Sequence, residues 1–151
     1  MASMKDRLRD DLTAAMKARD EVRTRTLRMA LTSLTREEVA GSSARELSDQ
    51  EVIGVLTREA KRRREAAEAF AAAGREEQAA AERAEEAVLD AYLPAQLSDE
   101  ELAAMAADVI AETGASGMAA MGQVMKALTP RVAGRADGAR SAAEVRRQLA
   151  G

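Results

Sequence analysis

The sequence predicts an all-α protein. Only Phe70 and Tyr92 are aromatic among its 151 residues, whereas 36 are alanine. Large apolar side chains are therefore too few for a thick sandwich or barrel, but alanine faces allow helices to pack closely. Apolar residues recur at the three- and four-residue spacing of helices, and no convincing alternating strand pattern is present.

Two helices are expected before Gly41-Ser42-Ser43 breaks the chain. Residues 4–18 form the first, with Met4, Leu8, Leu12, Ala15 and Met16 at helical spacing. Asp20 is suited to cap the second, because its carboxylate can accept from a free backbone N–H. The apolar face of that helix comprises Leu27, Ala30, Leu31 and Leu34.

Three Ser-x-x-Glu capping boxes mark later helix starts, because the serine accepts from the N3 amide while the glutamate reaches back. They are Ser48/Glu51, Ser98/Glu101 and Ser141/Glu144. The first box opens a long helix that ends near Gly74, and a second helix runs from about Arg75 to Leu93. Their expected inward residues are Val52, Ile53, Leu56, Ala60, Ala67 and Phe70, then Ala81, Ala84, Val88, Leu89 and Tyr92. The two helices are predicted to form an antiparallel hairpin.

Pro94 disfavours helix at the residue before it, so we place a boundary between domains 1–94 and 95–151 there. The second domain is predicted to hold three helices. Its middle helix presents Met118, Met121, Val124, Met125 and Leu128 on one face and ends at Pro130. A loop over residues 134–139 precedes a last helix that starts at Ser141, with Val145 and Leu149 inward.

Composition excludes several kinds of chemistry. The chain has no Cys and no His, so it offers no thiol nucleophile, imidazole base or Cys/His zinc site. Gly117 and Gly122 have the spacing of a phosphate loop, but Gln123 and Val124 replace its Lys and Ser/Thr. We therefore expect no catalytic residue, metal or cofactor. The first dozen residues lack the apolar core of a signal peptide and no run is long enough to span a membrane, so we expect a cytoplasmic protein with no membrane partner.

Charge is unevenly distributed although the net charge is only −3. The last segment, residues 113–151, is basic, and its arginines flank glycines just before a helix start. Helix starts attract anions and arginine forks suit phosphate, so this segment is a candidate phosphate-binding site. The candidates are Lys126, Arg131, Arg135, Arg140, Arg146 and Arg147. An Asp-Gly turn in which Asp137 neutralises one arginine explains the same residues equally well.

Weaker basic candidates are the consecutive residues Lys61, Arg62, Arg63 and Arg64. Consecutive residues wrap around a helix, and pairs such as Glu59–Arg63, Lys61–Glu65 and Arg64–Glu68 have the spacing of surface ion pairs. A solvated, salt-bridged face is therefore favoured over a nucleic-acid contact. The same interpretation holds for Arg19, Arg23, Arg25 and Arg28, and for the acidic stretch 76–86, where Glu82 and Glu86 are expected to face water.

Several segments together resemble the GatB/YqeY family. Residues 121–126, 128, 130 and 134–138 resemble its signature, residues 92–98 its link between two halves, and residues 16–20 with 27–29 its N-terminal helices. The signature maps onto Gly122, Met125, Lys126, Gly134, Arg135, Ala136, Asp137 and Gly138. Gln123, Ala133 and Ala139 depart from it, since relatives often carry Lys there.

The resemblance implies a two-part helical protein. Its C-terminal part is related to the tail of the B subunit of glutamyl/aspartyl-tRNA amidotransferase, which contacts transfer RNA and holds none of the chemistry. We therefore expect a non-catalytic tRNA-binding accessory module, with tRNA and an amidotransferase or aminoacyl-tRNA synthetase subunit as partners. The family label of carbon–nitrogen ligase activity with glutamine as amido-N-donor is interpreted as association, because the chain lacks the kinase-like and amidase portions.

Two further expectations accompany this hypothesis. The acidic face of the hairpin makes a protein–protein adaptor the alternative, and its alanines also suit pairing with a second copy of the chain. If the tRNA hypothesis holds, reversing Arg135 and Arg140 to Glu should weaken RNA binding and leave thermal stability nearly unchanged.

Overall fold

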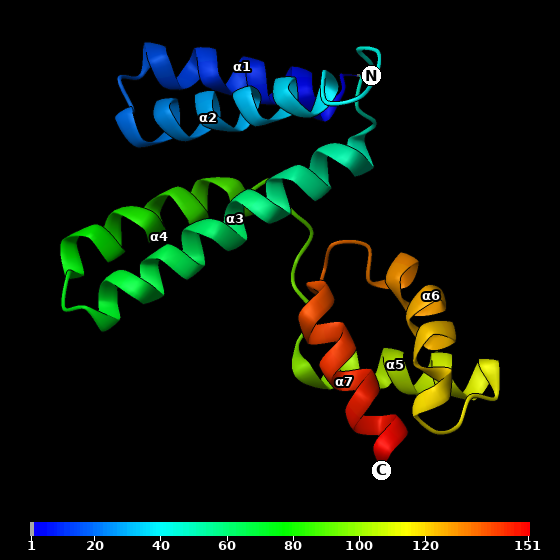
Figure 1. Cartoon of the computed structure of the whole chain (residues 1–151). Coiled ribbons are helices and arrows are strands. Elements are labelled where there is room, and N and C mark those ends of the chain that lie inside the picture. The colour runs from blue at the N-terminus through cyan, green and yellow to red at the C-terminus, as the bar shows by residue number, and fades with distance from the viewer. Residues whose placement is uncertain (1) are drawn as a thin grey trace. The chain divides into compact units, whose positions relative to one another are not determined.

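The computed structural model describes residues 2–151, and over that range the chain is all-helical, as predicted (Figure 1). Seven α-helices and one short 3₁₀ helix are present, with no strand among the described residues. None of these helices is long and apolar enough to cross a lipid bilayer. The helices form two compact units that divide between Leu93 and Pro94.

Four helices build the N-terminal unit. They are α1 (Met4–Lys17), α2 (Glu21–Glu38), α3 (Asp49–Ala72) and α4 (Glu76–Asp90). Helices α1 and α2 form one antiparallel pair, and α3 and α4 form the predicted hairpin (Figure 1). Leu8, Leu27, Leu34, Val52, Leu56 and Leu89 are fully buried where the two pairs meet.

Local signals set most of these boundaries. Ser48 and Glu51 form the predicted capping box, and Asp20 caps α2 by accepting from the Arg23 N–H at 3.0 Å. Gly74 follows α3 with φ at +75°, a conformation that glycine adopts without strain. One further capping box, which the sequence analysis did not predict, is formed by Ser3 and Asp6 at the start of α1.

The prediction for the inward face of α4 was partly wrong. Val88, Leu89 and Tyr92 are buried as expected, but Ala81 and Ala84 are exposed and Ala79 is buried instead. Compared with the prediction, α4 turns a different side inward. Glu85 and Glu86 point toward α2 and α3, where arginines bind them. A pattern that counts only apolar residues as inward therefore misplaces this face.

A buried ion network joins α2, α3 and α4. The side chain of Arg63 is only 8% exposed, and its Nη1 donates to Glu59 Oε2 at 2.7 Å. Its Nε lies 3.4 Å from Glu85 Oε2, close enough for an ion pair but without hydrogen-bond geometry. Glu59 also accepts from Ser33 Oγ of α2 at 3.0 Å, and Glu85 accepts from Arg25 Nε of α2 at 2.9 Å.

Tyr92, just after α4, anchors the hairpin to α1. Its hydroxyl donates to the Asp11 carboxylate, and the Arg7 guanidinium lies 4.9 Å from the centre of its ring. Burial, followed by the bond to Asp11, raises the pKa of Tyr92 to about 12. Both effects disfavour the phenolate in the folded protein.

The C-terminal unit holds α5 (Asp99–Thr113), the 3₁₀ helix η1 (Met118–Ala120), α6 (Met121–Val132) and α7 (Gly138–Ala150). The Ser98/Glu101 capping box starts α5 as predicted. Leu102, Val109, Val124, Leu128 and Val145 form the centre of the core, against which Met121 and Met125 pack. Met118, expected on the same face, is exposed instead.

Two boundaries in this unit were predicted wrongly. Pro130 does not end α6 but lies in its last turn, and the helix continues until Ala133 adopts a left-handed conformation. Proline costs one backbone hydrogen bond there, whereas continuation buries Val132 in the core.

The start of α7 is the other wrong boundary. Asp137 caps this helix by accepting from the Arg140 N–H at 2.8 Å, so the helix begins at Gly138 within the expected loop. Ser141 then lies inside the first turns, buried and without a hydrogen-bond partner for its Oγ. Glu144 accepts instead from Arg147 and Gln148, and these bonds lower the pKa of Glu144 to about 2.

Replacing Arg63 with Met should cost up to about 3–5 kcal/mol of unfolding free energy, because Glu59 and Glu85 would lose their shared buried cation and keep only the exposed arginines Arg62 and Arg25. Arg62→Met is the matched control, since that side chain is 67% exposed and contacts only Glu59 within the network. Urea denaturation followed by circular dichroism measures both. Equal losses of unfolding free energy in the two variants would contradict the role of Arg63 as the central cation of the network.

Alkaline pH should destabilise the N-terminal unit through Tyr92. Because its pKa is raised to about 12 from an ordinary value of 10, the contribution is complete below pH 10 and is lost as pH rises through 12. Tyr92→Phe should cost about 1–2 kcal/mol at neutral pH. It should also show a smaller further loss between pH 10 and 12 than the unmodified chain. Parallel pH-dependent loss in both proteins would show that other groups cause it.

Candidate functional site

The predicted phosphate-binding segment lies beside the start of the C-terminal unit. Arg135 Nε donates to the Ala95 carbonyl at 3.1 Å, and Arg140 Nη2 donates to the Leu97 carbonyl and to Asp99, each at 2.9 Å. The Leu97 N–H donates in return to the Arg135 carbonyl at 2.7 Å. These contacts fasten residues 95–99 to the connection between α6 and α7.

The contacts change the expectation for the two arginines. Arg135 and Arg140 hold backbone carbonyls of the same unit, so reversing their charge should disturb folding rather than leave thermal stability unchanged. Asp137 does not take the role foreseen in the alternative either, because its carboxylate caps α7. Neither interpretation of the segment includes its contacts with backbone carbonyls that lie about forty residues earlier in the sequence.

The family-signature residues largely build this same connection. Gly134 has φ at +81°, Ala136 is buried in the core, and Asp137 and Gly138 form the start of α7. Earlier in the signature, Gly122 and Lys126 lie on the exposed side of α6 and Met125 on its core side. In this chain most of the signature therefore shapes the loop before α7.

Four predicted cations remain toward solvent. Arg131 pairs with Glu112 and Arg147 with Glu144, yet their side chains are 43% and 68% exposed. Lys126 and Arg146 are exposed and have no carboxylate partner among the described residues. Arg135 and Arg140 are less exposed, at 38% and 35%, and donate to backbone carbonyls, so these four side chains are the more available ones to an anion.

The weaker candidates at 61–64 are mostly committed to the N-terminal unit. Arg63 is buried in the ion network, Arg62 contacts Glu59, and Arg64 Nη1 donates to Glu86 Oε2 at 3.1 Å. Of the three expected i,i+4 pairs, only Glu59–Arg63 forms. Glu86 was expected to face water but is mostly covered, and its burial raises its pKa.

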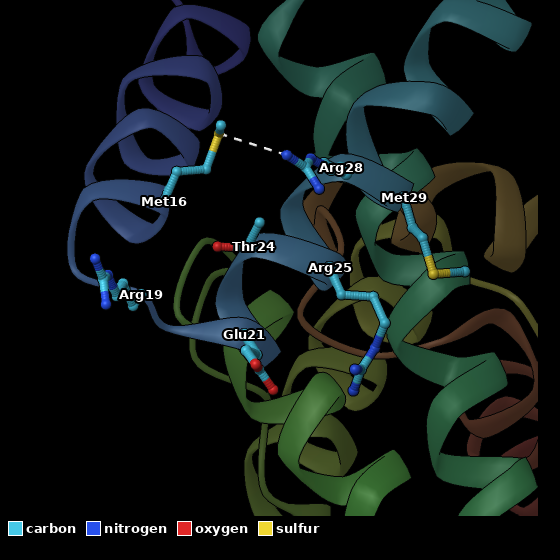
Figure 2. Close-up of a pocket in the computed structure, with 7 residues that line it drawn as sticks. All are labelled: Met16, Arg19, Glu21, Thr24, Arg25, Arg28 and Met29. Atoms are coloured by element: carbon cyan, nitrogen blue, oxygen red, sulfur yellow. Dashed lines mark hydrogen bonds between the residues drawn. The ribbon is translucent and has the colours of Figure 1, made fainter.

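A cavity that the sequence did not predict lies between α1 and α2 (Figure 2). It is open to solvent and has a volume of about 810 Å³. Its walls are Met16, Arg19, Glu21, Thr24, Arg25, Arg28 and Met29. We call it the α1–α2 groove. Figure 2 shows Met16 near the end of α1 and Arg19 in the turn that follows, with the other side chains along α2.

Two methionines make this groove unusual for a charged surface. Met16 and Met29 are 49% and 46% exposed, and the Arg28 Nη2 lies 3.7 Å from the Met16 Sδ. The sequence contained one signal for it, because Met29 is an apolar residue on the otherwise polar side of α2. The neighbouring Arg25 and Arg28 favour a solvated face, and the single apolar residue among them does not alter that prediction.

Comparison with known protein families matches residues 5–149 to the family described as Yqey-like protein. The chain belongs to this family. The match covers nearly the whole chain and therefore both units, which confirms the resemblance drawn from the motifs. No curated protein matches the chain significantly.

Replacing Arg140 with Met should destabilise the C-terminal unit by about 1–2 kcal/mol, because two bonds to Leu97 and Asp99 are lost. Hydrogen exchange of the Leu97 amide, whose N–H donates to the Arg135 carbonyl beside this contact, should accelerate as the segment loosens. Arg146→Met is the control, since no bond of that side chain is lost. Unchanged Leu97 exchange in the Arg140 variant would remove the proposed fastening role.

Proposed function

We propose that this YqeY-family chain is a non-catalytic accessory module that binds transfer RNA in amidotransferase or aminoacylation systems. The observation that carries the proposal is the set of four outward cations on the C-terminal unit, Lys126, Arg131, Arg146 and Arg147. Family membership adds support, since the C-terminal part resembles a tail that contacts tRNA.

The four cations differ in how readily they can take a phosphate. Lys126 and Arg146 need no rearrangement. Arg131 and Arg147 must leave surface carboxylates, but exposed ion pairs contribute only about 0–1 kcal/mol, so a phosphate can replace the partner. A guanidinium then binds two phosphate oxygens at once, which favours phosphate further.

Recognition would depend on shape and backbone rather than on base identity. The only aromatic residues, Phe70 and Tyr92, belong to the N-terminal unit, so the C-terminal unit offers no ring on which a base can stack. Folded RNA helices are bound mainly through phosphates and 2′-hydroxyls. Arg135 and Arg140 would act indirectly, by holding the connection that leads into α7.

Binding without catalysis also agrees with the titratable groups. The large pKa shifts belong to Tyr92 and Glu144, and each has a structural cause in its own neighbours. Tyr92 is tied to Asp11, and Glu144 is a surface group held by Arg147. Neither group lines a described cavity where a substrate would meet it.

An adaptor acting through the α3–α4 hairpin is the second candidate. The observation in its favour is a row of exposed alanines on α4, at positions 80, 84 and 87. The row follows the exposed Glu76 and Glu77 in the sequence. Small side chains permit close approach of a partner helix. Two carboxylates of the acidic stretch, Glu85 and Glu86, serve internal ion pairs instead.

Reversing Lys126 and Arg146 to Glu should weaken tRNA binding at least about tenfold, which corresponds to about 1.4 kcal/mol. Loss of two phosphate contacts should also reduce the slope of log affinity against log salt by roughly 1.4–1.8. Fluorescence anisotropy with labelled tRNA, at several salt concentrations, measures both quantities.

The matched control is Arg83→Glu, an exposed arginine of α4 in the other unit. It should leave affinity nearly unchanged, and an unstructured RNA of equal length should bind more weakly than tRNA. The proposal fails if tRNA does not bind at low salt. The site assignment alone fails if the double variant binds as tightly as the unmodified chain.

A further inference from the structure

The α1–α2 groove combines positive charge with exposed apolar surface. Its ionisable lining is three arginines and one glutamate, and Met16 and Met29 are each nearly half exposed. Exposed methionines beside arginines are typical of surfaces that bind protein partners. The groove lies in the N-terminal unit and shares no residue with the cations proposed for tRNA.

Two of the three groove arginines are not neutralised. Arg25 is held by Glu85 at 2.9 Å, whereas Arg19 and Arg28 have no carboxylate partner among the described residues. Arg28 contacts only the Met16 sulfur, at 3.7 Å. These two guanidiniums can therefore take acidic groups of a ligand without first losing a partner.

The groove is built on fixed elements. Met29 Sδ lies 3.6 Å from the buried Arg63 Nη2, so the ion network supports the wall on that side. Arg19 has φ at +57°, and the Asp20 N–H that follows donates to the Ala15 carbonyl at 3.0 Å. A wall that is ordered before binding loses less conformational entropy when a ligand docks.

The groove also continues along α2. A second cavity of about 240 Å³ shares Met29 with the first and adds Arg36 of α2 and Arg62 of α3. From Glu21 to Arg36, α2 rises roughly 22 Å at 1.5 Å per residue. That length accommodates about four turns of a bound helix.

We propose that this face of α2 binds an acidic, amphipathic helix of a partner protein. Its carboxylates would pair with Arg19, Arg28 and Arg36, and its apolar residues at i, i+3/i+4 and i+7 would cover Met16 and Met29. RNA fits less well, because phosphates and 2′-hydroxyls would leave the exposed apolar surface of Met16 and Met29 uncovered.

A nuclear magnetic resonance titration of the full chain, labelled at the methionine methyl groups, tests the proposal. The probe is a synthetic 16-residue peptide with Leu at i, i+3, i+4 and i+7, Glu at the positions that flank them and Ala elsewhere, a composition that favours a helix. We expect it to shift the signals of Met16 and Met29, while the signal of Met105, which packs against the core of the other unit, stays unchanged. Arg19→Gln/Arg28→Gln should weaken binding at least tenfold, and Arg83→Gln should not.

Three control ligands separate charge, apolar contact and the source of the acid. A peptide with Lys in place of Glu should not bind, and one with Gln in place of Leu should bind at least tenfold more weakly. Equal binding of the Glu/Gln peptide, or no shift with the Glu/Leu peptide, would overturn the proposal. So would groove shifts caused by tRNA, or shifts that grow with protein concentration alone, which indicate a second copy. If the peptide does not bind, the tRNA proposal still stands, because that proposal is tested separately with the variant at Lys126 and Arg146.

Discussion

The buried guanidinium of Arg63 fixes how three helices of the N-terminal unit meet. Removing a charge from water is costly, and the cost is recovered only when carboxylates and further hydrogen bonds surround the group. Glu59 and Glu85 meet that demand, and they in turn bind Ser33 and Arg25 of α2. One buried cation therefore sets the position of α2 on the hairpin. It also supports Met29, and with it one wall of the groove.

Arginine serves two physical roles in this chain, and the fold separates them. Arg135 and Arg140 donate to backbone carbonyls, so their geometry is specified and they stabilise a loop. Arg19, Arg28 and Arg146 lack carboxylate partners among the described residues and project their charge outward. In the sequence the two groups of arginines cannot be told apart. Only the distance to an acceptor distinguishes an arginine that completes the fold from one that is available to a ligand.

Features that depend on residues close in sequence were mostly predicted correctly, whereas those that depend on contacts between distant residues were not. The boxes at Ser48 and Ser98 need residues three apart, and both formed as predicted. Ser141 has the same local pattern, but Asp137 lies one turn earlier and caps the helix first. The prediction for the inward face of α4 was partly wrong because Glu85 and Glu86 lie on that face, and their arginine partners lie on other helices. Met29 was the one local signal for the groove, whose remaining geometry exists only once α1 and α2 lie side by side.

The conformation of Arg19 links the turn to the groove. A residue other than glycine in the left-handed region costs roughly 1–2 kcal/mol, and φ at Arg19 is +57°. Glycine would relieve this strain and still allow Asp20 to cap α2. It would also remove the only cation that α1 and the turn contribute to the groove lining. Ala133 adopts the same left-handed conformation at the end of α6, so this conformation belongs to the way these helices end. At Arg19 it also places a positive charge at the groove, so helix termination and the charge of the groove depend on one residue.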